Sequence, residues 1–266
     1  MKRLSVILAL CFVFLAGNVM ALPFNTRPLN EPPAALYNTG TGEQKLGGTG
    51  GIFQDIGFNA GASNPVSTQS SAAIFTNAGS GGSVASFIIA IAGNAISNEV
   101  GIYKYGAVST LVPIFGGVTS PNGGTQATIS FFSDGSLRVT STGLGGGVVN
   151  NTYAGFGNTF GFYLKGPGGT FYSEDDQNSG GNPQALIYQG NGVDTIRVPG
   201  FAPGLFDVAE WIIAFEDLAY ANTDRDFNDF VFIVESINPV PEPISMLLFG
   251  TGLVGIGGYV RRRFKK

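Results

Sequence analysis

Six oxygen-bearing side chains lie close together near the C-terminal end of the chain, and oxygen is the ligand atom that hard cations prefer. Two of them, Glu216 and Asp217, close an apolar run that begins at Trp211. The other four precede a second apolar run, 230–234; they are Asp224, Asp226, Asn228 and Asp229. Both runs are rich in aromatic and β-branched residues, so we expect two strands of an antiparallel pair.

A hairpin of these two strands would bring the acids to one end of a sheet, with Arg225 as the nearby cation. Two carboxylates about 4 Å apart repel each other by roughly 4 kcal/mol at an effective dielectric constant near 20. A bound calcium ion would offset this repulsion. On an extended chain Asp229 faces away from Asp226 and Asn228, so it would accept hydrogen bonds from backbone amides instead. The alternative is that all these acids cap turns and hairpin N–H groups.

A second acidic segment, residues 172–181, combines three consecutive acids with an amide and two glycines. Its candidate ligands are Glu174, Asp175, Asp176 and Asn178. A tight polar loop of this kind can aim several oxygens at one point, as a calcium loop does. The alternative interpretation is a solvated turn.

The composition excludes several classes of chemistry. The chain has no histidine, and its one cysteine, Cys11, lies in the predicted signal peptide. Catalysis by Ser-His-Asp or Cys-His is therefore excluded, as are histidine-ligated metal sites. Paired acids do hydrolyse glycosides, but nothing in the sequence fixes the separation of two carboxylates. We expect the protein not to be an enzyme.

The charge is strongly asymmetric along the chain. Residues 22–241 hold 7 basic and 17 acidic residues, a formal charge of −10. Nucleic-acid binding needs a basic surface, so no nucleic-acid partner is expected. The same charge disfavours docking on anionic lipid headgroups.

The N-terminal segment, residues 1–21, has the organisation of a secretory signal peptide. A basic start is followed by an apolar region, 4–15, and by the small-residue cleavage site Val19-Met20-Ala21. We expect signal peptidase to release a mature chain that begins near Leu22. An uncleaved anchor is the alternative, but the apolar region is too short to span a bilayer comfortably.

The body of the chain has the pattern of an all-β protein. Residues 22–82 form a Gly/Pro-rich lead-in with one candidate strand at 52–58, whereas residues 83–237 contain eleven short apolar runs separated by turn formers. This spacing predicts an antiparallel β-sandwich or jelly roll. The expected strands lie at 83–92, 100–105, 109–115, 127–132, 136–140, 160–165, 170–172, 185–188, 194–198, 211–215 and 230–234. Residues 143–147, with Asn150 and Asn151, are expected to form a flexible connection.

The C-terminal segment, residues 238–266, is organised differently. Pro241, Glu242 and Pro243 precede 17 residues without a formal charge, 244–260. At 1.5 Å per residue a helix of this length spans about 26 Å, slightly less than a typical hydrocarbon core. We expect one transmembrane helix whose basic tail, 261–266, stays in the cytoplasm; the tail begins with Arg261, Arg262 and Arg263. A permanent anchor is the alternative.

This order of triplet, apolar span and arginine-rich tail resembles the PEP-CTERM sorting signal of Gram-negative bacteria. The resemblance implies recognition by an exosortase, removal of the tail, and export to the cell surface or extracellular matrix in bacteria that make exopolysaccharide. The body also resembles an uncharacterised extracellular domain family, through residues 160–164, 172–175 with Asn178, 215–218 and 224–229. That family has no established activity.

Together these features predict a non-enzymatic surface or matrix protein, of the kind found in biofilms. Its precursor would be anchored transiently in the inner membrane. The second hypothesis is a carbohydrate-binding module that recognises the exopolysaccharide of the cell.

Overall fold

The computed structural model describes residues 52–57, 70, 72–78, 83–89, 97–116, 126–142, 148–198, 201–223 and 227–240. The predicted signal peptide, the predicted transmembrane segment 244–260 and the basic tail lie outside these residues. The described part is built from antiparallel strands, which confirms the predicted all-β class. Among the described residues there is no helix with the length and apolar character needed to cross a membrane.

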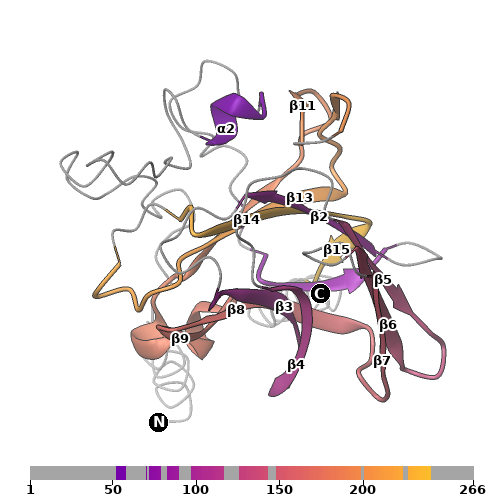
Figure 1. Ribbon diagram of the computed structural model, residues 1–266, viewed down its shortest axis with the longest axis vertical. Helices are drawn as coiled ribbons and strands as arrows, with labels where there is room; N and C mark the ends of the chain where they lie inside the picture. The colour runs from indigo at the N-terminus through magenta and orange to yellow at the C-terminus, as the bar shows by residue number, and fades with distance from the viewer. Residues whose placement is uncertain are drawn as a thin grey trace, which may run out of the picture.

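Two large sheets make up the body (Figure 1). The first sheet has the strand order β15-β1-β8-β3-β4, and β9 also pairs with β8. These strands are β1 Ile74–Asn77, β3 Glu99–Lys104, β4 Ala107–Gly116, β8 Thr159–Gly166, β9 Gly169–Tyr172 and β15 Ile237–Pro239.

The second sheet has the order β10-β13-β14-β2-β5-β6-β7. Its strands are β2 Ser83–Ile89, β5 Gln126–Phe131, β6 Leu137–Thr142, β7 Val148–Tyr153, β10 Ala185–Gln189, β13 Glu210–Phe215 and β14 Phe230–Glu235. A small third pair joins β11 Thr195–Ile196 to β12 Gly204–Leu205.

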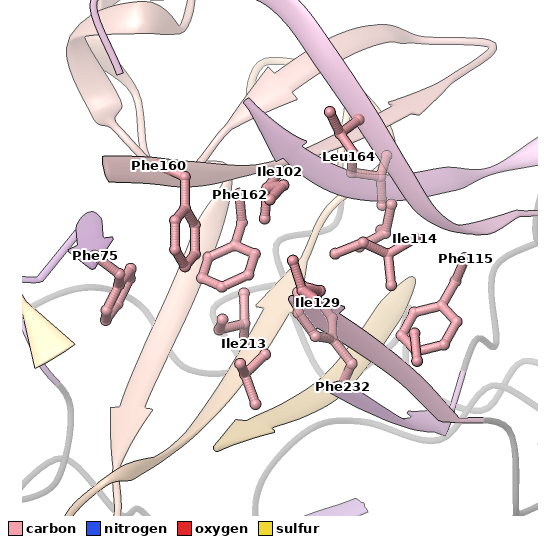
Figure 2. Close-up of a cluster of buried hydrophobic side chains, with 14 of the residues drawn as sticks. Phe75, Ile102, Ile114, Phe115, Ile129, Phe160, Phe162, Leu164, Ile213 and Phe232 are labelled. Carbon is pink, nitrogen blue, oxygen red and sulfur yellow. The ribbon is translucent and has the colours of Figure 1, made fainter. Parts of the chain in front are cut away.

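The main core lies between the two large sheets. Figure 2 shows Phe75 and Phe162 of the first sheet facing Ile213 and Phe232 of the second. The rings of Phe162 and Phe232 have centroids 5.5 Å apart, and Phe75 packs edge-on against Trp211 at 5.1 Å. Such aromatic pairs stabilise the fold by more than the burial of their apolar area alone would. Alternate residues of β3, β8, β13 and β14 point into this core, as a sandwich requires.

A second core covers the outer face of the second sheet. Here α2, Ile52–Asp55, and the β11–β12 pair pack on the side away from the first sheet (Figure 1). The prediction of a strand at 52–58 is thus wrong, because this segment begins with a helical turn. The turn places Ile52, Phe53 and Ile56 in one buried cluster, in which the Phe53 and Tyr188 rings lie 4.9 Å apart.

The sheets also include segments that the sequence pattern did not indicate as strands. Strand β1 precedes the predicted start of the sandwich at Ser83, and Phe75 of this strand is fully buried. Asn150 and Asn151, expected in a flexible connection, lie in β7 and pair with β6. Because β7 is an edge strand of the second sheet, its polar side chains can remain exposed to water.

A reciprocal contact between tyrosines and glycines locks β3 to β8. Gly101 is paired with Tyr163, and Tyr103 is paired with Gly161. A Cβ atom at Gly161 would lie 2.3 Å from the Tyr103 ring, and one at Gly101 would lie 2.7 Å from the Tyr163 ring. Each ring therefore covers the glycine opposite it, on the face turned away from Ile102 and the main core.

We predict that Gly161→Ala lowers the free energy of unfolding by about 1–3 kcal/mol, because the added methyl group must displace the buried Tyr103 ring. Chemical denaturation measures this loss. Gly204→Ala is the matched control, since a Cβ atom there meets nothing within 4 Å. Equal stabilities of the two variants would contradict the tyrosine–glycine contact.

Candidate functional site

The predicted acidic hairpin end is formed by β13 and β14. The two strands pair antiparallel from Glu210–Glu235 to Phe215–Phe230. Glu216 and Asp217 therefore leave β13 at the same end of the sheet at which Asn228 and Asp229 enter β14. Two further predicted ligands, Asp224 and Asp226, lie outside the described residues, as does Arg225.

Three carboxylates at this end accept hydrogen bonds from the chain around them. Glu216 accepts the backbone N–H of Phe227 through Oε1. Asp229 Oδ2 accepts the backbone N–H of Asp217 at 2.8 Å, which is the role that the sequence predicts for Asp229. Asp217 Oδ2 accepts a hydrogen bond from Asn98 Nδ2, also at 2.8 Å. The first two bonds join the ends of β13 and β14, and the third joins Asp217 to the residue that precedes β3.

The backbone here adopts a conformation that is uncommon for a bulky residue. Phe227 has φ of 54°, in the left-handed region, and its ring is completely buried. Non-glycine residues keep such a conformation only where the surroundings enforce it. The Glu216 carboxylate and the second core, into which the ring packs, hold it there.

Two buried amides at this end were not identified from the sequence. Asn98 and Gln184 are 0% and 2% exposed. The NH₂ group of Asn98 donates to Asp217, and that of Gln184 donates to the carbonyl of Leu218 at 2.7 Å. Within the described part of the chain, the side-chain oxygens Asn98 Oδ1 and Gln184 Oε1 are buried and accept no hydrogen bond. Neither residue lies in an acidic run, so residue type and spacing gave no signal for them.

The hairpin end thus gathers oxygen atoms in a buried setting. Glu216 and Asp217 are 0% and 2% exposed. Carboxylate and amide oxygens are the ligand types that calcium prefers. However, among the described residues no group of three or more acidic side chains is arranged to hold a metal ion.

The second predicted ligand segment is a compact loop after β9. It contains two short 3-10 turns, Asp175–Gln177 and Ser179–Gly181. The buried Asn178 between them accepts the N–H of Tyr172 at 2.9 Å and donates to the carbonyls of Tyr172 and Glu174 at 2.9 and 3.2 Å. The Asn178 amide therefore closes this loop, while Asp176 is exposed.

The two acidic segments adjoin different ends of β9. At one end, the turn between β8 and β9 packs on the hairpin end, since a Cβ atom at Gly168 would lie 2.3 Å from the carbonyl oxygen of Asp217. At the other end, Tyr172 pairs with Tyr163 and leads into the acidic loop. The eight candidate ligands among the described residues thus belong to two separate places in the fold.

Glu174 of the acidic loop is held against the outer face of the first sheet. Its Oε1 accepts the Tyr103 hydroxyl at 2.5 Å. Burial raises the pKa of Glu174, and the neighbouring Asp176 raises it further, although the bond from Tyr103 opposes both effects. The pKa of Tyr103 is raised as well, by burial first and by Glu174 next.

The C-terminal segment is the part of the chain that matches a known motif. Residues 239–263 match the PEP-CTERM protein-sorting motif, and the match includes the predicted triplet 241–243, the apolar segment 244–260 and the three arginines. This motif supports an exported protein with a C-terminal membrane-anchoring sorting signal that an exosortase processes. The comparison with curated proteins finds no match. The comparison with solved structures finds none either. The resemblance of the body to an extracellular domain family therefore stays a prediction.

We predict that Glu174→Gln stabilises the protein more at pH 7 than at pH 4. A carboxyl group whose pKa is raised on folding favours the folded state when protonated, so stability falls as the pH rises through its titration. The amide keeps an acceptor for Tyr103 without the charge. Because Glu174 is only half-buried, we expect less than about 1 kcal/mol.

Melting temperatures of both forms between pH 4 and pH 7 test this prediction. Asp194→Asn, in the segment before β11, controls for the loss of one negative charge. A stability difference that does not change with pH would contradict it.

Proposed function

We propose that the protein is a non-enzymatic component of the bacterial cell surface or extracellular matrix. An exosortase would release it from a transient anchor in the inner membrane, and its β-sandwich would be stabilised by calcium. The observation that carries the proposal is the match of residues 239–263 to the PEP-CTERM motif at the end of an all-β body. The sorting signal would direct the body of the chain out of the cell, and a compact β-sandwich is suited to the extracellular environment.

The junction between body and sorting signal supports this division of roles. Strand β15 ends at Pro239, the first residue of the matched segment, and pairs with β1. Val240 then donates its backbone N–H to the carbonyl of Ile74 at 2.9 Å. The residues directly before the triplet Pro241-Glu242-Pro243 are thus held in the first sheet.

Composition supports the non-enzymatic part of the proposal. Residues 22–266 contain neither histidine nor cysteine, so the common nucleophile–base pairs cannot be assembled from them. The buried acids Glu216 and Asp217 already serve as hydrogen-bond acceptors at the hairpin end.

The calcium part of the proposal is supported by the character of the hairpin end. Buried carboxylates and the two amide oxygens of Asn98 and Gln184 lie at the end of the sheet where Asp224 and Asp226 join the same connection. A cation bound there would compensate the charge of Glu216 and Asp217. Carbohydrate binding remains the second hypothesis from the sequence.

We predict that replacement of Pro241, Glu242 and Pro243 by alanine blocks processing, because the exosortase would no longer recognise the signal. The mature wild-type chain should lack its basic tail, whereas the variant should keep Lys266 and stay in the membrane fraction. Intact-mass measurement after fractionation distinguishes the two. Pro203→Ala, at an exposed proline outside the matched segment, is the control and should be processed normally. Removal of the tail from the triple variant would contradict the proposal.

We predict that 10 mM calcium stabilises the full-length chain, purified in a mild detergent, by about 1.4–2.7 kcal/mol. This range follows from dissociation constants of about 0.1–1 mM, typical of extracellular modules, and corresponds to a rise in Tm of about 3–10 °C. Asp226→Ala should abolish the rise. Asp176→Asn tests whether the acidic loop holds a separate ion, and Asp207→Asn, outside both segments, should respond like the wild type. No rise in Tm, with an unchanged melting curve for Asp226→Ala, would exclude the site.

A further inference from the structure

A pocket lies on the outer face of the second sheet, at the edge of the β11–β12 pair. Its volume is about 190 Å³, far above the roughly 10–15 Å³ that a cavity needs to hold one water molecule. The lining is apolar and polar in about equal parts. Ile196, Val198, Phe201 and Leu205 come from the β11–β12 region and Ile233 comes from β14, whereas Gln126 of β5, Glu210 and Glu235 supply the polar groups. The pocket is therefore suited to a small organic group rather than to water alone.

Two carboxylates line the same pocket. Glu210 of β13 and Glu235 of β14 are direct cross-strand partners, an arrangement that is unfavourable for like charges. Glu210 Oε2 accepts the backbone N–H of Asp207 at 2.8 Å, which fixes the orientation of its carboxylate. Burial raises the pKa of Glu210, and the neighbouring charges of Glu235 and Asp207 raise it further. A positive charge bound in the pocket would reduce the repulsion between the two carboxylates and would stabilise their charged forms.

We propose that this pocket binds the primary ammonium group of a small organic amine, with the carbon body of the amine against the apolar wall. The two glutamates would share the charge, and Ile196, Phe201 and Leu205 would cover the carbon atoms. A bare divalent cation fits less well, because calcium takes six to eight oxygen ligands and the side-chain oxygens of this lining come from three residues, Gln126, Glu210 and Glu235.

The pocket is separate from the acidic hairpin end. Glu210 and Glu235 pair at one end of β13 and β14, whereas Phe215 and Phe230 pair at the other. The inference therefore does not rest on the proposed calcium site or on the sorting signal, and it can fail or succeed independently of both.

An ammonium group on a short carbon body can come from an alkylamine or from an amino sugar. Calorimetric titration of the full-length chain, purified in a mild detergent, distinguishes these sources with n-butylammonium and glucosamine as probes. The neutral counterparts n-butanol and N-acetylglucosamine test the need for the charge. We expect saturable binding of at least one amine and no binding of its neutral counterpart.

Two substitutions test the site itself. Glu235 is exposed, so Glu235→Gln should leave the fold intact and weaken amine binding about fivefold, as expected for the loss of one partly exposed charge pair. The double variant Glu210→Gln with Glu235→Gln should bind no amine. Glu99→Gln, an acid on β3 of the first sheet, is the matched control and should bind like the wild type.

Three results would overturn the proposal. The first is that neither amine binds to the wild-type chain. The second is that the neutral counterparts bind as well as the amines, which would make the pocket a purely apolar one. The third is that Glu235→Gln and the double variant bind the amine as tightly as the wild type does.

Discussion

Aromatic rings from two sheets meet in the layer between them, and the fold depends on this contact because residues 22–266 contain no cysteine to form a disulfide. The rings of Phe131 and Phe160 stack at 5.3 Å, and those of Phe115 and Phe230 lie 6.4 Å apart. These pairs join distant parts of the sequence, so the two sheets are stable only as a unit. The burial of large aromatic side chains is the stabilisation available to such a chain.

The outer faces of the two sheets are covered in different ways. On the first sheet, Tyr103 and Tyr163 lie over the glycines of the neighbouring strand and bond to Glu174 and Glu99. On the second sheet, α2 and the β11–β12 pair form a further apolar layer. The candidate ligands and the two glutamates of the pocket therefore lie at the hairpin end, in the loop after β9, and beside the β11–β12 pair.

Sequence reasoning found the elements whose pattern is local. The pairing of β13 with β14 follows from two apolar runs and the turn residues between them, and Asp229 bonds to a backbone amide as expected. Strand β1 was not found, because four residues in a Gly- and Ser-rich stretch give no periodic signal. The place of β1 in the sheet is decided by the packing of Phe75 on Trp211. The helical turn at Ile52 was mistaken for a strand because short apolar runs fit both patterns.

The candidate site could likewise be predicted from the sequence only in part. Its acids are visible as clusters in the sequence, whereas Asn98 reaches Asp217 across 119 positions of the chain. The pocket beside Glu210 likewise depends on the pairing of β13 with β14 and on the placement of the β11–β12 pair over the sheet. Contacts of this kind are set by tertiary packing and have no counterpart in residue spacing.

The hydrogen bond from Val240 to Ile74 has a geometric consequence for how the exported protein is held before processing. Beyond this bond, only Pro241, Glu242 and Pro243 separate the sheet from the apolar segment, and three residues span at most about 11 Å. If the sorting signal anchors the precursor in a bilayer through residues 244–260, as proposed, the folded domain would therefore lie within about 11 Å of the lipid. An enzyme that cleaves this junction before release would then have to act close to the lipid surface.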